Sequence, residues 1–121
     1  MDEREVLTAD QAAFYEENGY LLLENRVPMD IIEAIRAEVA RFHEEARGMT
    51  ESNDRLDLED SHSPDNPRIR RIKLPHRISP VMNDLLRSDH ILAPVRDLIG
   101  PDVRLHTTKL NSIFKLITFW L

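Results

Sequence analysis

Five histidines are the residues of this sequence best suited to bind a metal or move a proton. A non-haem iron site uses two histidines and one carboxylate, and its usual sequence sign is His-x-Asp or His-x-Glu in extended chain. The one match is His43-Glu44-Glu45, which falls inside a predicted helix. Residues two apart on a helix point about 200° apart around its axis, so His43 and Glu45 do not chelate one ion. We interpret this motif as a solvated helix face.

A second group of potential ligands lies in a polar segment, residues 49–67. His62 and Asp65 lie there together with three further carboxylates, Asp57, Glu59 and Asp60. Oxygen-rich loops bind divalent cations, but the spacing of an EF-hand and its central glycine are absent. A weak divalent-cation site is therefore the less favoured interpretation of this segment. The HExxH, GxSxG, P-loop and GxGxxG patterns are also missing from the sequence.

The densest basic cluster is Arg68-Ile-Arg-Arg-Ile-Lys73, followed by His76 and Arg77. Five cations within ten residues suit a phosphate, a carboxylate or a nucleic acid. No aromatic residues alternate with them for base stacking and the chain is acidic overall, so nucleic acid is disfavoured. The alternative is a basic loop that balances the acidic first half. Lys109 offers a further cation, which either meets an anionic partner or lies at a solvated edge.

Length and charge limit the protein class. The chain has 121 residues, the size of one small domain, and a net charge of −6. Residues 1–67 carry 18 acidic and 6 basic side chains, whereas the rest carries 4 acidic and 10 basic ones. The absence of cysteine excludes disulfides, thiolate metal sites and a cysteine nucleophile. The acidic start is no signal peptide, and no run approaches the roughly 20 apolar residues that span a bilayer. We expect a cytoplasmic protein that binds neither membrane nor nucleic acid.

The first half predicts two helices and one strand. Thr8-Ala-Asp-Gln11 fits a capping box and predicts a short helix that ends at Gly19. The apolar run at residues 20–23 predicts a buried strand. A long helix is predicted over Met29–Ala46, because apolar residues recur at three- to four-residue spacing. These positions are Ile31, Ile35, Val39, Phe42 and Ala46. Residues 49–67 are predicted to be a flexible acidic loop.

The second half predicts further strands and two helices. Residues 68–74 predict a strand or an extended segment, and Ser79-Pro80 predicts the start of a helix that ends at about Leu86. A second helix is predicted from Asp89 to Leu98, with a kink at Pro94 and a stop at Gly100-Pro101. Residues 103–110 alternate between two faces and predict a strand. The apolar residues 113–121 predict a last strand.

The opening of the phytanoyl-CoA dioxygenase family closely resembles Leu7-Thr-Ala-Asp-Gln-Ala-Ala-Phe-Tyr-Glu-Glu-Asn-Gly-Tyr-Leu-Leu-Leu-Glu-Asn-Arg-Val-Pro28. In that family a capped helix leads through Asn-Gly-Tyr/Phe-Leu into a first strand, followed by Val-Pro and a long helix. The family's next stretch resembles Ser79-Pro-Val-Met, Asp89-His-Ile-Leu and Leu98-Ile-Gly-Pro-Asp-Val-Arg-Leu-His106. The resemblance covers about residues 7–111, and its first block is specific only in combination.

The resemblance implies an α+β chain: the N-terminal helices and first strands of a double-stranded β-helix (jelly-roll) oxygenase, truncated before the metal-binding strands. It implies Fe(II) and 2-oxoglutarate as cofactors and hydroxylation of a small-molecule substrate in the full-length enzyme. By this resemblance Lys73 lies near the sequence position at which the family has a lysine that can meet 2-oxoglutarate. Residues 103–110 resemble the strand that lines the 2-oxoglutarate pocket, so His106, Thr108 or Lys109 would touch the co-substrate.

The sequence departs from the family after Asn111. The family's iron-binding His-x-Asp should follow shortly, but Ser-Ile-Phe-Lys-Leu-Ile-Thr-Phe-Trp-Leu does not resemble it. We therefore expect a single partial domain over residues 1–121, with an atypical apolar end at 112–121. It would carry no metal ligands and no catalytic residues, and bind neither iron nor 2-oxoglutarate tightly. Residues 113–121 would promote self-association. The alternative is a small non-catalytic module that binds an anionic ligand or partner through residues 68–77.

Overall fold

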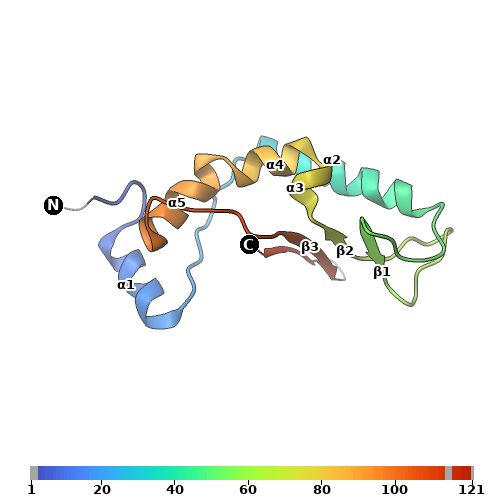
Figure 1. Cartoon of the computed structure of the whole chain (residues 1–121), viewed down its shortest axis with the longest axis horizontal. Helices are drawn as coiled ribbons and strands as arrows, with labels where there is room; N and C mark the ends of the chain where they lie inside the picture. Colours follow the sequence, from blue (N-terminus) through green and yellow to red (C-terminus); the bar gives the residue numbers. More distant parts are fainter. Residues whose placement is uncertain (1–2, 114–115, 121) are drawn as a thin grey trace.

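The structure is a computed structural model that describes residues 3–113 and 116–120. Within these residues a row of helices lies over an antiparallel sheet, and α1 lies beside the outer end of α5 (Figure 1). The helices are α1 (Ala9–Asn18), α2 (Met29–Ala46), α3 (Pro75–Ile78), α4 (Pro80–Leu86) and α5 (Asp89–Ile99). The strands are β1 (Leu56–Leu58), β2 (Ile69–Lys73), β3 (Lys109–Ile113) and β4 (Leu116–Trp120). None of the helices described here is long and apolar enough to cross a bilayer.

α1 begins and ends where its sequence signals predict. The N–H of Gln11 donates to the Thr8 hydroxyl at 3.1 Å, and the N–H of Thr8 donates to the Gln11 side chain at 2.9 Å. Gly19 takes a left-handed φ of 79°, which glycine adopts without a Cβ penalty. α1 buries no residue fully, so its ends are fixed by capping rather than by packing.

The strand predicted at residues 20–23 is wrong. These residues form no strand in the structure, and Tyr20 and Leu22 keep 62% and 72% of their surface exposed. The Tyr20 ring instead meets Phe14 edge-on, with ring centroids 5.3 Å apart. Four apolar residues in a row indicate burial, but a strand also needs a neighbour for its backbone groups. The four-stranded sheet, β1-β2-β3-β4, offers none at this place.

α2 spans Met29–Ala46 as predicted and covers one face of the sheet. Four of its five predicted apolar positions are buried, and Ile31 is half-buried. Its outer face carries three exposed or partly exposed i,i+3 ion pairs, Glu33–Arg36, Glu38–Arg41 and Glu44–Arg47. Such surface pairs contribute at most about 1 kcal/mol each, so apolar burial is what holds α2 against the sheet.

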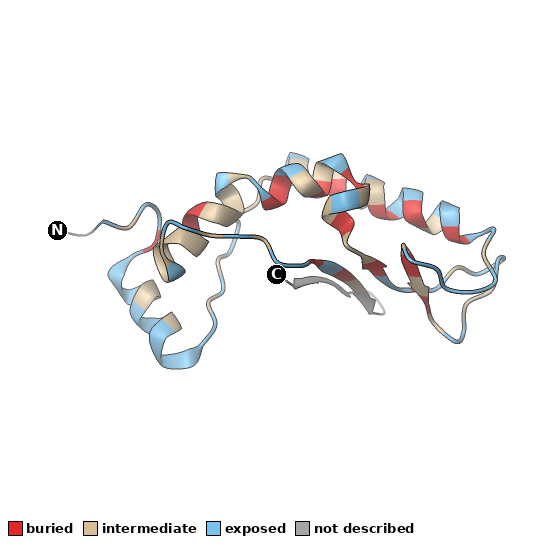
Figure 2. Ribbon diagram, viewed as in Figure 1, coloured by how far each residue is buried: buried red, intermediate tan, exposed pale blue. Residues whose placement is uncertain are grey.

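The sheet is an antiparallel meander whose inner face forms the core. Leu56, Ile72 and Leu110 lie in one register row across β1, β2 and β3, and each is at most 1% exposed. This row belongs to one hydrophobic cluster with Phe42 of α2 and Met82 of α4. Figure 2 shows the buried residues along these helices and on the strands that face them. The opposite face of the same strands is therefore left for polar residues.

The other predicted elements are confirmed in part. β2 lies within residues 68–74, and α4 begins after Ser79, whose hydroxyl accepts the N–H of Met82 at 3.3 Å. α5 contains Pro94 and ends at Ile99, directly before Gly100; the kink at Pro94 stays a prediction. The prediction for residues 49–67 missed β1, whereas the flexibility of that loop is still a prediction.

The strand predicted at residues 103–110 is wrong over most of its length. Only Lys109 and Leu110 of that range belong to β3, which continues to Ile113. The alternation of the sequence indicated a strand, but the described sheet has no partner for residues 103–108. Residues 113–121 contain β4 as predicted; residues 114, 115 and 121 lie outside the described part.

Candidate anion-binding site

Two of the predicted co-substrate residues, Lys73 and Lys109, are brought together by the sheet. They are direct partners on β2 and β3. Residues directly opposite each other in an antiparallel pair point to the same face, with Cβ atoms about 4.5–5.5 Å apart. Both lysines alternate with the buried Ile72 and Leu110, so they lie on the face opposite the core. Like charges placed directly opposite destabilise a sheet, and this pair therefore favours an anion.

Asp57 of β1 holds two cations of this face. Arg71 Nε donates to Asp57 Oδ2, and Lys73 Nζ lies 3.1 Å from Asp57 Oδ1. Lys73 Nζ also donates to the Asn53 carbonyl at 2.7 Å. Burial raises the pKa of the Asp57 carboxyl, but the hydrogen bonds and charges of Arg71 and Lys73 outweigh burial and hold that pKa below its usual range. Asp57 is therefore an anion at neutral pH that orients both neighbours.

The polar group on this face has a net positive charge. Asn111 is the direct partner of Arg71 on β3 and adds an amide to the same side. We call Asp57, Arg71, Lys73, Lys109 and Asn111 the cationic face. Its three cations exceed its single carboxylate by two charges. Within the described residues the Lys109 side chain makes no hydrogen bond or ion pair, so its ammonium has no competing partner there.

Thr108 and His106 do not join the cationic face. Thr108 is 3% exposed, and its Oγ1 lies 2.6 Å from His76 Nδ1 of α3. His106 is exposed and lines a separate groove of about 460 Å³ with Arg104 and apolar side chains of α5. The predicted co-substrate residues thus fall in three places. The reason is that residues 103–108 are not a strand, so alternation does not set their directions.

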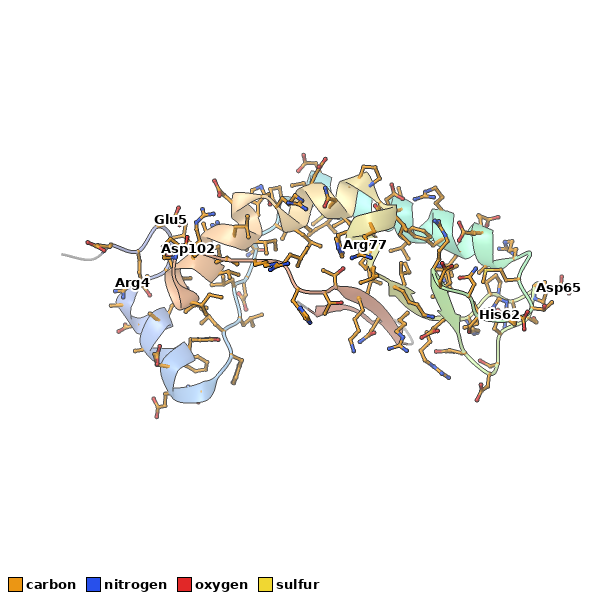
Figure 3. All side chains as sticks on the ribbon, in the orientation of Figure 1. Arg4, Glu5, His62, Asp65, Arg77 and Asp102 are labelled. Atoms are coloured by element: carbon orange, nitrogen blue, oxygen red, sulfur yellow. The ribbon has the colours of Figure 1, made fainter. Side chains whose placement is uncertain are left out.

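The other metal-ligand candidates are occupied by hydrogen bonds. The N–H of Arg68 donates to His62 Nδ1 at 3.0 Å, so the ring hydrogen lies on Nε2, which donates to the Met49 carbonyl at 2.8 Å. Within residues 3–113 and 116–120, no three side chains of the ligating types gather closely enough to hold a metal. His62 and Asp65 lie at the end of the molecule remote from Arg4 and Glu5 (Figure 3). The structure gives no support to the divalent-cation site.

The two ends of the His43-Glu44-Glu45 motif also have separate partners. His43 Nδ1 lies 3.0 Å from the Val39 carbonyl one turn earlier in α2. Glu45 accepts two hydrogen bonds from Arg55, at 3.0 and 3.1 Å. The motif belongs to a helix, as the sequence indicated, and its side chains serve α2 and the segment before β1.

The basic segment 68–77 does not form one patch. Arg71 and Lys73 belong to the cationic face, whereas His76 is turned to Thr108. Arg70 and Arg77 are exposed. Sequence reasoning did not assign Asp57 or Asn111 to this site, because strand register, not spacing along the chain, brings them to Arg71.

A helical layer covers one face of the sheet, and a cationic face occupies the other. This arrangement defines an α+β protein whose sheet carries a cationic face. The family model for phytanoyl-CoA dioxygenase (PhyH) matches residues 15–119. The chain belongs to this family.

Individual relatives agree with this membership. An ectoine dioxygenase from Bordetella parapertussis is 31% identical over 108 residues, which cover 88% of this chain and 33% of the relative. A probable alpha-ketoglutarate-dependent hypophosphite dioxygenase from Stutzerimonas stutzeri is 26% identical over 103 residues, which cover 85% of this chain and 36% of the relative. The chain spans about a third of the length of the curated relatives it matches.

Two solved structures are similar to the chain. The crystal structure of EctD from S. alaskensis with bound Fe matches with a TM-score of 0.69 and 25% identity, over 90% of this chain and 38% of that one. The structure of the same protein with 2-oxoglutarate and 5-hydroxyectoine matches with a TM-score of 0.63 and 25% identity, over 91% of this chain and 39% of that one.

Proposed function

We propose that this chain is the N-terminal part of a jelly-roll, Fe(II)- and 2-oxoglutarate-dependent dioxygenase, and that its cationic face binds 2-oxoglutarate. The observation that carries the proposal is the direct pairing of Lys73 with Lys109 on the open face of the sheet. Family membership supports it, as does the solved EctD structure that holds 2-oxoglutarate. A small-molecule substrate and a cytoplasmic location stay predictions.

The charges of the cationic face fit a dicarboxylate. Lys109 provides an ammonium with no competing partner among the described residues, and Asn111 provides an amide donor on the same strand face. The Lys73 ammonium is paired with the Asp57 carboxylate. This ion pair fixes the position of the ammonium and limits its freedom to follow a ligand. A net charge of two on the face is balanced by the two carboxylates of 2-oxoglutarate. Charge-assisted hydrogen bonds from fixed donors are the stronger kind.

Iron does not fit the residues described here. Bound iron would supply the oxygen-activating chemistry of such an enzyme. The described part offers no set of three ligating side chains, so in this proposal metal ligation falls to polypeptide outside it. For the chain by itself we expect neither tight iron binding nor turnover of 2-oxoglutarate. Iron-dependent release of succinate by the purified chain would contradict that expectation.

The test is a titration of 2-oxoglutarate into the purified chain, followed by calorimetry or by amide shifts in NMR spectra. Lys109→Met and Lys73→Met remove one ammonium each and keep most of the length of the side chain. Each should raise the Kd about fivefold, because an accessible ion pair contributes about 1 kcal/mol. Arg36→Met is the matched control, since Arg36 lies on the outer face of α2 and pairs with Glu33. Equal effects of all three variants would refute a site on the cationic face.

A second candidate function is the small non-catalytic module that binds anions through residues 68–77. Arg70 favours it, because this cation is exposed and has no polar contact within the described residues. The Arg70→Ala/Arg71→Ala double variant separates the two candidates when phosphate is titrated beside 2-oxoglutarate. The module predicts that phosphate binds as well as 2-oxoglutarate and that the double variant weakens both. The dioxygenase predicts a clear preference for 2-oxoglutarate.

A further inference from the structure

A partly buried polar contact joins α3 to the residue that precedes β3. His76 Nδ1 lies 2.6 Å from Thr108 Oγ1, and the two residues are 32 positions apart in the sequence. Thr108 is 3% exposed, so its hydroxyl depends on this contact for hydrogen bonding. A short contact between two distant segments restrains the position of one relative to the other. Here it restrains the residue that precedes β3 relative to α3.

Both lysines of the cationic face lie close to one end of this contact along the sequence. Lys109 follows Thr108 directly. Lys73 is followed by Leu74, whose left-handed φ of 46° turns the chain from β2 into α3, two residues before His76. The His76–Thr108 contact thus adds a side-chain link between α3 and the residue before β3, beside the pairing of Lys73 with Lys109 in the sheet. Within β3, Lys109 alternates with the buried Leu110 and lies on the cationic face, and the contact of Thr108 restrains the residue directly before it.

We propose that His76 is a positioning residue: through Thr108 it sets the direction of Lys109 opposite Lys73. The consequence for 2-oxoglutarate rests on the proposed function, whereas the geometric claim holds with or without a ligand. The polar contact of the His76 ring is with the buried Thr108, which is not part of the cationic face. The role of His76 is therefore measured at Lys109, through the chemical shift of the Lys109 amide.

The surroundings of His76 make this contact sensitive to protons. Burial lowers the pKa of His76, and the charges of Arg77 on α3 and Arg87 at the end of α4 lower it further. On the β3 side the ring meets the uncharged Thr108, while Lys109 points to the other face. The imidazole is therefore neutral at pH 7. Protonation would add a cation beside two arginines and make Nδ1 a donor, so the contact with Thr108 would change.

The first test needs no variant and no ligand. An NMR titration of the wild-type chain from about pH 8 to about pH 5 follows the imidazole of His76 and the amides of Lys73, Lys109 and Gly19. The amides of both lysines should shift with the midpoint of His76, whereas Gly19, at the end of α1, should not. The proposal is overturned if the Lys109 amide does not follow His76.

Variants at Thr108 separate positioning from general stability. Thr108→Val keeps the shape and removes the hydroxyl, whereas Thr108→Ser keeps the hydroxyl. Thr108→Val should uncouple the Lys109 amide from His76 and raise the Kd for 2-oxoglutarate about fivefold, while Thr108→Ser should change it less than about twofold. His76→Asn, which keeps a polar group near Nδ1, should restore more affinity than His76→Ala. An unchanged coupling in Thr108→Val would overturn the proposal.

The two proposals fail in different ways. If the wild-type chain binds no 2-oxoglutarate, the proposed function fails, and the pH titration of the amides alone decides the role of His76. If the wild-type chain binds 2-oxoglutarate and Thr108→Val binds it equally well, the proposed function stands and His76 does not position Lys109.

Discussion

The Asp97 carboxylate accepts the backbone N–H of Leu7 at 2.9 Å, across 90 positions of sequence. It also accepts the N–H groups of Glu5 at 2.7 Å and Val6 at 2.9 Å. One side chain of α5 therefore satisfies three consecutive donors in the segment that leads into α1. Leu7 is buried at 6% exposure, so the contact anchors the segment before α1 at a packed residue.

Replacing Asp97 with Asn should release this segment. The amide keeps one acceptor oxygen and places an NH₂ group against backbone donors. We expect a loss of about 1 kcal/mol, since each hydrogen bond to a charged group contributes about 1.5–3 kcal/mol and solvent reduces that value here. Hydrogen exchange at Glu5, Val6 and Leu7 should accelerate. Asp102→Asn is the control, because Asp102 is exposed and bonds to none of the three donors. Equal exchange in both variants would show that Asp97 does not anchor the segment.

The free energy of unfolding should depend on pH in two steps. The pKa of His76 is lowered from 6.5 by burial and by nearby arginines, so the unfolded chain binds a proton first as the pH falls. Stability is full above about pH 6.5 and declines below it, through the lowered pKa of the folded state. Urea unfolding at a series of pH values should show this decline. His76→Ala should remove it, whereas His90→Ala should leave it in place.

Asp57 and Asp97 contribute to the second step, at lower pH. Burial raises the pKa of both Asp57 and Asp97, but hydrogen bonds from cations and from backbone N–H groups, respectively, bring each below 3.8. Because the unfolded carboxyls protonate first, stability is present above about pH 3.8 and is lost as the pH falls through the lowered values. The same urea series, extended to lower pH, should show a decline that is smaller in Asp57→Asn and Asp97→Asn. If the free energy of unfolding declines with falling pH as steeply in both variants as in the wild type, neither aspartate causes the decline.

Replacing Phe42 with alanine should unfold the chain. It is 0% exposed at the centre of the core, and its ring lies 4.6 Å from the Arg41 guanidinium. Phe42→Ala removes buried surface and leaves a cavity, at a cost of about 3–5 kcal/mol. That is a large share of the stability of a small domain. Circular dichroism should report largely unfolded protein. Phe14→Ala is the control, because Phe14 is 40% exposed on α1 and should change stability little.

The elements that the sequence predicted well are those with local signals. α2 follows from apolar spacing after Pro28, and α1 from Thr8 and Gly19 at its ends. Lys73 and Lys109 could be named separately, through family resemblance. Their direct pairing could not, because strand register depends on contacts between distant segments.

The two wrong strand predictions also depend on contacts between distant segments. Residues 20–23 and 103–108 have the composition of strands, but strand formation requires a partner that a single sequence does not reveal. α3 was missed because it depends on the left-handed Leu74, a conformation that leucine rarely adopts. The contact between His76 and Thr108 follows from that turn and carried no sequence signal.

Association of copies should run through β4. In the part of the chain that the structure describes, β4 pairs with β3 on one side and no strand borders its other side. Such an edge presents unpaired N–H and C=O groups to another chain. Deleting residues 114–121 makes β3 the edge, and β3 carries Lys109, a charge that opposes strand pairing. Light scattering at increasing concentration should therefore fall in the deletion variant.

A second apolar surface provides the comparison for that experiment. Tyr20 and Leu22 are strongly exposed, so they offer copies another place to associate. The Tyr20→Ser/Leu22→Ser variant keeps β4 and removes this surface. If its scattering matches that of the wild type while the deletion lowers scattering, association runs through β4. If scattering falls in the serine variant and persists in the deletion, copies meet at residues 20–22, and the edge of β4 is not the route.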